Sequence, residues 1–92
     1  MKSNQIQNKY FKTSNFNLAV YLLCKGLRLV SIEKNNSHRK SFVYEDVPQR
    51  EHLVEVFNFG KENHSEITLD IRKVFTISKE LKNKLYLESE SI

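Results

Sequence analysis

The densest apolar stretch of the chain lies between a polar Thr-Ser-Asn and a glycine. Apolar residues occupy nearly every position from 16 to 24, which is too many for a helix with a single apolar face. The pattern therefore predicts a helix that is buried over most of its circumference. Ser14 or Asn15 can accept a hydrogen bond from the free N–H groups at its start, and Gly26 marks its end. We expect a capped core helix within residues 14–26.

Three other segments are short and rich in aromatic or β-branched residues, which predicts strands. They are "KYFKT" at 9–13, "LRLVSIEK" at 27–34 and "RKSFVYED" at 39–46. In the last of these, aromatic side chains occupy alternate positions, as on one face of a strand. The polar connection at 35–38 is short, so the second and third strands are predicted to form an antiparallel hairpin.

Two further helices are predicted in the second half of the chain. One begins within "DVPQ" at 46–49, where proline is tolerated in the first turn, and ends at Gly60. After a loop at 61–66, the other begins at Thr68 or Asp70. Its apolar stripe recurs at helical spacing: Ile71, Val74, Phe75, Ser78, Leu81 and Leu85.

The predicted order of elements is β-α-β-β-α-α. This order predicts an α+β fold in which a single layer of three strands, the short N-terminal strand plus the hairpin, packs against three helices. With 92 residues the chain has enough length for one core, so we expect one domain at 9–87. Flexible ends are expected at 1–8 and 88–92. In the last helix, Glu80 and Lys84 are four residues apart in the order that favours an ion pair.

The succession of these motifs resembles a known family of small domains. "FKTSNFNLAVYLLCKG" leads into "LRLVSIEK", then "SFVYED", and the chain closes with "LKNKLY". It is similar to a family of unknown function found in bacteria, archaea and their phages or plasmids. The resemblance covers about residues 10–87, although Asn15 stands where aspartate is commoner. It implies the fold and a phage or plasmid origin, but no activity.

The chain has the features of a cytoplasmic protein. Its single cysteine, Cys24, cannot form an internal disulfide or build a zinc site alone, which fits a reducing compartment. The first nine residues lack the apolar run of a signal peptide. The longest apolar run, at 18–24, is far shorter than the roughly 20 residues that cross a bilayer, so no membrane contact is expected.

Candidate catalytic and metal-binding groups do not form a convincing set. The histidines occur singly, at His38, His52 and His64. A metal site needs several ligands that converge, and Cys24 has no predicted base beside it. Two interpretations fit the acidic residues Glu45, Asp46 and Glu51: a magnesium site, or stabilisation of the positive N-terminal end of the predicted helix. We favour the second. We therefore expect no enzyme, no metal and no cofactor.

Charge is strongly segregated along the chain, although the net charge is only +4. Residues 1–40 carry +7 and residues 41–70 carry −5. Residues 71–87 carry +4, and residues 88–92 carry −2. A distribution of this kind predicts a basic face and an acidic face on one small domain.

The basic N-terminal part contains aromatic residues between its cations. Lysine and arginine neutralise phosphates, and aromatic faces stack on unpaired bases, so this composition favours binding of DNA or RNA. If the first strand pairs beside the hairpin, these groups share a sheet surface. The predicted nucleic-acid-binding residues are Lys9, Tyr10, Lys12, Arg28, Lys34, His38, Arg39 and Lys40. In the plainer interpretation the same lysines are solvated groups that protect sheet edges.

A second hypothesis is a protein-interaction module, namely a subunit, an inhibitor or a homodimer. Oppositely charged faces suit complementary docking on a second copy or on a host protein. Exposed aromatic residues would then anchor the partner. The candidate anchors are Tyr21, Phe57, Phe59 and Tyr86.

Overall fold

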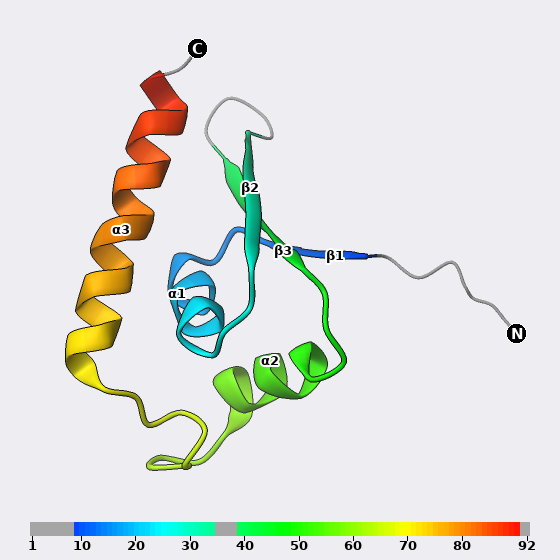
Figure 1. Ribbon diagram of the computed structural model, residues 1–92. Coiled ribbons are helices and arrows are strands. Elements are labelled where there is room, and N and C mark those ends of the chain that lie inside the picture. Colours follow the sequence, from blue (N-terminus) through cyan, green and yellow to red (C-terminus); the bar gives the residue numbers. More distant parts are fainter. Residues whose placement is uncertain (1–8, 35–38, 91–92) are drawn as a thin grey trace, which may run out of the picture.

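The computed structural model describes residues 9–34 and 39–90 (Figure 1). Three strands and three helices follow one another in the predicted order, which confirms the α+β class. Their bounds are β1 Tyr10–Thr13, α1 Phe16–Cys24, β2 Leu29–Lys34, β3 Lys40–Glu45, α2 Arg50–Phe59 and α3 Ile71–Glu90. No helix in this described part is long and apolar enough to cross a membrane.

The three strands form one antiparallel sheet with β3 in the middle, in the order β1-β3-β2. The first strand thus pairs beside the hairpin, which meets the condition for a shared sheet surface. Phe42 and Tyr44 of β3 belong to the main core, and alternation turns Val43 to the opposite, outer face. In β2 the register shifts between Leu29 and Ser31, which leaves one extra residue as a bulge.

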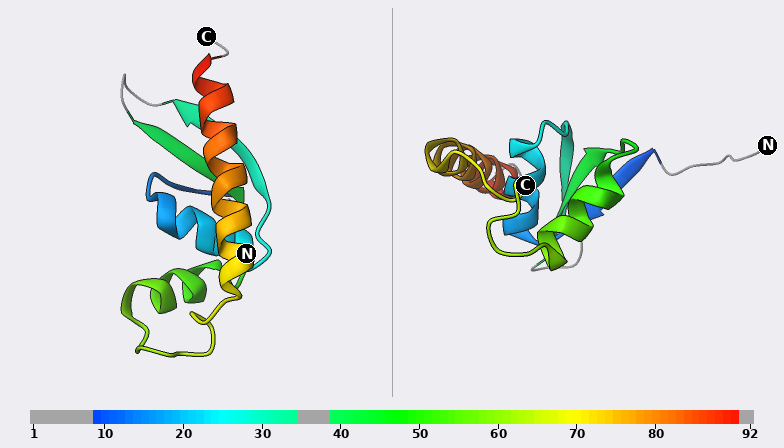
Figure 2. Two further views of the ribbon diagram at one scale, coloured as in Figure 1. Left: turned by 90° about the vertical axis from the view of Figure 1, so that its left-hand side faces the viewer. Right: turned by 90° about the horizontal axis from the view of Figure 1, so that it is seen from below.

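The core is built around α1, which lies between the sheet and α3 (Figure 2). The buried residues of this helix are Leu18, Ala19, Val20, Tyr21, Leu22 and Cys24. Burial on most sides explains why its sequence is apolar at nearly every position. One buried polar contact fixes the sheet to the helix, because the Tyr44 hydroxyl donates to the carbonyl of Ala19 at 2.7 Å.

Both ends of α1 follow from local chemistry. The Asn15 side chain accepts from the Leu18 N–H at 3.1 Å, so Asn15 is the cap. At the other end Gly26 has φ +96°, in the left-handed region that favours glycine. Its N–H donates to the Leu23 carbonyl and the Leu27 N–H donates to the Leu22 carbonyl, each at 3.0 Å. This pair of bonds is the Schellman motif.

The later helices begin close to where the sequence predicted, and the last one ends later than expected. Helix α2 begins at Arg50, after a turn, because Asp46 binds the Val47 N–H and the Arg50 guanidinium and does not cap a helix. Helix α3 begins at Ile71, with the Asp70 carboxylate accepting from a backbone N–H of the first turn. It continues to Glu90, so three residues of the expected C-terminal tail are helical. Residues 1–8 and 91–92, the remainder of the expected flexible ends, lie outside the described residues.

Candidate nucleic-acid interface

Seven of the eight predicted binding residues lie in the described part of the chain, and they occupy three places along the sheet. At one end, Lys9 and Arg28 lie beside acidic residues. The Asp46 N–H donates to the Lys9 carbonyl at 2.8 Å, and the Glu45 N–H donates to the Arg28 carbonyl at 3.0 Å. Tyr10, half exposed, is opposite Glu45 in the register. Positive and negative charges therefore alternate at this end of the sheet.

Lys12 lies in the middle of β1 on the outer face of the sheet. Its ammonium is 3.0 Å from the carboxylate of Glu33, and both side chains are about half exposed. Because Glu33 belongs to β2, the pair joins the two edge strands across β3. The charge of Lys12 is therefore already compensated within the molecule.

The third place is the end of the hairpin. Lys34 and Lys40 are opposite each other in the register, and Arg39 immediately precedes β3. His38 lies outside the described residues. The end of the hairpin therefore brings these three predicted cations together, with Glu33 and Ser41 as the next pair in the register.

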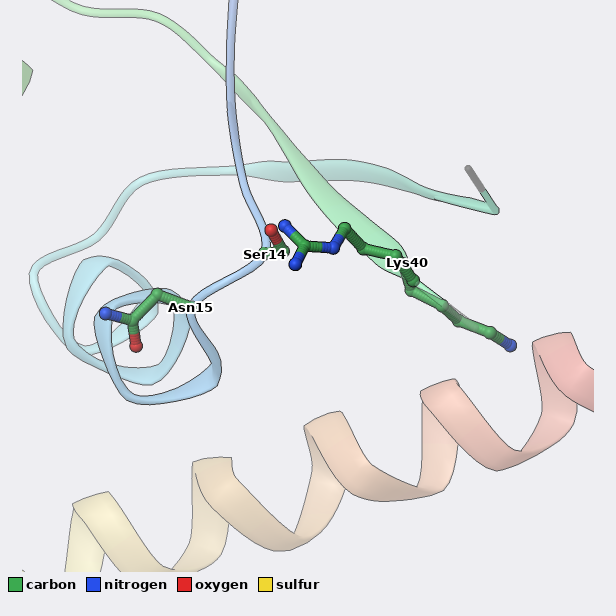
Figure 3. Close-up of a pocket in the computed structure, with 4 residues that line it drawn as sticks. Ser14, Asn15 and Lys40 are labelled. Atoms are coloured by element: carbon green, nitrogen blue, oxygen red, sulfur yellow. The ribbon is translucent and has the colours of Figure 1, made fainter. Parts of the chain in front are cut away.

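An open cleft of about 550 Å³ lies at this end, and we call it the tip cleft. Its described lining consists of Ser14, Asn15, Arg39 and Lys40, so the described part of the lining contains cations and neutral polar groups but no carboxylate (Figure 3). Ser14 and Asn15 come from the segment that leads into α1, and Lys40 comes from the start of β3. The cleft thus joins residues that are far apart in sequence.

Two neighbouring features add positive potential to the tip cleft. Helix α1 begins here with no acidic residue in its first turn, and the Asn15 side chain caps its Leu18 N–H. In addition, the ammonium of Lys82 lies 5.8 Å from the centroid of the Phe16 ring, at the first residue of α1. The eight predicted binding residues do not include Lys82, which directly follows the buried Leu81 of α3.

A second cleft, of about 520 Å³, contains some of the other predicted residues but has a different electrostatic character. It is lined by Tyr10, Phe11, Lys12, Asp46 and Arg50. The Arg50 guanidinium donates to both carboxylate oxygens of Asp46, at 3.0 and 3.2 Å, and covers the Phe11 ring at 4.3 Å. The hydrogen bond to Asp46 raises the pKa of Arg50. Both cations of this cleft therefore have a carboxylate partner, which makes it less suited to phosphate.

Several of the described groups considered for catalysis make structural contacts. Cys24 is buried, and burial raises the pKa of its thiol, which disfavours the reactive thiolate. His52 Nε2 lies 2.7 Å from Glu66 Oε1, and the Glu66 N–H donates to His64 Nδ1. The Tyr21 hydroxyl donates to the Glu66 carbonyl at 2.9 Å, which ties this loop to the core. Among the described residues no three His, Cys, Asp or Glu side chains form a metal site.

Comparison with known proteins adds a family but no activity. A family model described as a domain of unknown function (DUF5659) matches residues 8–87. No curated protein and no solved structure matches the chain. The match includes β1 and extends through most of α3, in agreement with the resemblance seen in the sequence.

Proposed function

The chain belongs to the DUF5659 family, whose function is unknown, and from its own surface we propose that it is a small, non-catalytic nucleic-acid-binding protein. It contacts phosphates at the tip cleft. The observation that carries this proposal is the meeting of Arg39, Lys40 and the start of α1 around an open cleft whose described lining has no carboxylate.

The groups at the tip cleft match the chemistry of a phosphodiester. A guanidinium and an ammonium donate charge-assisted hydrogen bonds to phosphate oxygens, and the Ser14 hydroxyl and helix N–H groups donate further ones. Contacts of this kind position a nucleic-acid backbone and do not identify its sequence. The proposal therefore extends to DNA and RNA alike, with affinity that falls as salt rises.

The remaining predicted residues have graded roles in this proposal. Lys34 extends the basic surface along the hairpin from the tip cleft, and Lys82 extends it across the beginning of α1. Lys12 contributes little because Glu33 already compensates it. Lys9 and Arg28, beside acidic residues at the opposite end of the sheet, lie outside the proposed contact.

Fluorescence anisotropy with labelled single- and double-stranded DNA and RNA, at about 50 mM and about 200 mM salt, tests the proposal. We expect measurable binding at the lower salt and a loss of about tenfold for Arg39→Glu. Lys61→Glu is the matched control, because this exposed lysine follows α2 and makes the same charge change away from the cleft. Absence of binding at low salt, or equal losses in the two variants, contradicts the proposal.

Service to a phage or another mobile element is a further part of the proposal. It rests on the resemblance of "FKTSNFNLAVYLLCKG" and the motifs that follow it to a family found in such elements. The genes that flank this one test it: integrase, replication or capsid genes support the proposal, and a conserved metabolic operon contradicts it.

Exposed aromatic residues favour a protein-interaction module as the second candidate. Phe59 is 80% exposed and Tyr86 is 66% exposed, whereas Tyr21 is buried and packs on Phe57 at 5.3 Å between ring centroids. Only the first two can therefore anchor a partner. Light scattering tests whether the protein forms a homodimer. If it does, Phe59→Ser should make it monomeric. A monomer at all concentrations that also captures no host protein contradicts this candidate.

A further inference from the structure

A groove runs between the outer edge of β2 and helix α3. It consists of two adjoining cavities that share Leu29 and Lys84, with volumes of about 260 and 170 Å³. We call it the β2–α3 groove. Figure 2 shows β2 as the strand of the sheet nearest to α3, with β1 at the opposite side.

The larger cavity exposes the backbone edge of β2. Its lining includes four consecutive residues, 29–32, of this strand. Side chains of successive strand residues point to opposite faces, so a cavity that touches all four lies along the edge of the strand. Since β2 is at one end of the sheet order, its outer N–H and C=O groups have no strand partner in the described part of the chain.

We propose that the β2–α3 groove binds an extended peptide of another protein, which adds to the sheet as a fourth strand beside β2. The peptide places one aliphatic or aromatic side chain in the smaller cavity and a carboxylate beside Lys84. Recognition by strand addition combines backbone hydrogen bonds, which give affinity, with side-chain pockets, which give specificity.

The smaller cavity supplies the apolar part of this recognition. Leu23, Ile77 and Leu81 form much of its wall, and its volume is about 170 Å³. An apolar cavity of about 150 Å³ takes up benzene, so this one has room for a leucine or phenylalanine side chain. At the larger cavity, Val30 is 43% exposed and Leu87 is 64% exposed, and a bound strand would cover both.

Lys84 supplies the charge that selects the peptide. It lines both cavities, and it makes no ion pair in the described part of the chain. The pair with Glu80 that the sequence predicted is not formed. Glu80 also lines the smaller cavity, whereas Lys84 is the only charged residue in the described lining of the larger one. An ammonium at the larger cavity favours a carboxylate there over a neutral or basic group.

The same lysine argues against a second copy of this chain as the occupant. Two β2 strands that pair edge to edge about a two-fold axis would present the same patch to each other. Lys84 lines both cavities, so the two ammonium groups would approach each other at the larger cavity, whose described lining contains no acid. A carboxylate-bearing peptide has no such repulsion.

The probe is an acetylated peptide of about eight residues that alternates threonine and leucine and carries one central aspartate. Its binding to the isotope-labelled protein is followed by amide NMR shifts and hydrogen exchange. We expect shifts concentrated at residues 29–32 and 84–87, and slower exchange of the outward amides of β2. A peptide with N-methyl groups at alternate positions should not bind, because the backbone bonds of the added strand are removed.

Charge variants separate this site from general attraction to a basic helix. Lys84→Glu should lower the affinity for the aspartate peptide about tenfold. The same variant should raise the affinity for a matched peptide that carries lysine in place of aspartate. Lys79→Glu on the same helix makes the same charge change outside both cavities and should leave both affinities unchanged. Far-ultraviolet circular dichroism confirms that both variants keep their helices.

Four results would overturn the inference. They are no saturable binding at about 1 mM peptide, equal effects of the two variants, shifts that map elsewhere, and unchanged binding of the N-methylated peptide. If the β2 amides exchange more slowly as the protein concentration rises, in the absence of peptide, the groove binds a second copy of the chain. Amide shifts at residues 29–32 caused by an oligonucleotide would assign the groove to nucleic acid. If Arg39→Glu loses oligonucleotide binding but still binds the peptide, the two sites are separate and the inference about the groove stands.

Discussion

The ammonium of Lys12 lies 3.0 Å from the carboxylate of Glu33, and this contact spans the sheet from one edge strand to the other. Neighbouring strands are roughly 4.8 Å apart, so the two side chains must extend over β3 to meet. In the register Lys12 is opposite Val43, which is only 4% exposed on this outer face. The aliphatic stem of the lysine thus contributes to the burial of the middle strand while its charge is compensated.

The first prediction concerns the strength of this pair. Both side chains are about half exposed, so solvent screens the attraction, and Lys12→Ala should lower the free energy of unfolding by less than about 1 kcal/mol. Urea denaturation of Lys12→Ala, Glu33→Ala and the double variant gives the coupling between the two residues. A coupling near zero would show that the contact contributes no stability.

The second prediction concerns the buried hydroxyl of Tyr44. Tyr44→Phe removes its 2.7 Å bond to the Ala19 carbonyl and should cost about 1 kcal/mol in urea denaturation. Burial also raises the pKa of Tyr44, so its contribution to stability is complete below the ordinary pKa of about 10 and is lost as pH rises through the folded value. Tyr44→Phe should flatten that alkaline loss.

The control for Tyr44 is Tyr86, which is 66% exposed. Tyr86→Phe removes the same atom from the surface of α3 and should change the free energy of unfolding by less than about 0.5 kcal/mol. Equal costs at the two positions would mean that the hydrogen bond between β3 and α1 does not stabilise the fold.

The third prediction concerns the carboxylate of Glu66. The hydrogen bond from His52 is the largest cause of a lowered pKa for Glu66, with a smaller effect of His64. Any stability linked to this shift is present above the unfolded pKa and is lost as pH falls through the folded one. His52→Leu should return the pKa of Glu66 towards its ordinary value, as measured by NMR titration of the carboxyl carbon. If His64→Asn raised the pKa of Glu66 more than His52→Leu does, His52 would not be the main cause of the lowered pKa.

The fourth prediction distinguishes the two glycines. At Gly26 an added Cβ meets nothing within 4 Å, but φ is +96°, so Gly26→Ala should cost about 1–2 kcal/mol in unfolding free energy. Gly26→Asn should cost less, because asparagine tolerates left-handed backbone better. At Gly60 a Cβ would lie 2.6 Å from the Val56 carbonyl oxygen, so alanine and asparagine should both destabilise there. Equal costs for the two variants at position 26 would contradict the backbone argument.

Sequence reasoning predicted those features of the fold that depend on local chemistry. Asn15 caps α1 and Gly26 ends it, because each satisfies backbone groups within a few residues. The start of α2 also lies within the predicted segment 46–49, since Gln49 is its N-cap. The packing of the Arg50 guanidinium on the Phe11 ring, in contrast, exists only once β1 and α2 are placed together in three dimensions.

The candidate site could be predicted only in part, for a related reason. The cations of the first forty residues form one group in sequence, but the register of β3 places them at three positions along the sheet. Compensation of Lys12 by Glu33 depends on two strands that do not pair directly. Lys82 contacts the Phe16 ring from a helix more than sixty residues later, and spacing alone cannot show such a contact.

The fifth prediction uses this partition to test the proposed function. A cation that neutralises a phosphate releases a counterion, so its removal reduces the slope of log affinity against log salt by about 1. Arg39→Ala at the tip cleft should show this reduction. Lys12→Ala should not, because the ammonium of Lys12 is paired with Glu33 before any nucleic acid arrives. Anisotropy titrations at four or more salt concentrations measure both slopes. If Lys12→Ala lowers the slope as much as Arg39→Ala, the nucleic acid displaces Glu33 and the interface extends onto the outer face of the sheet.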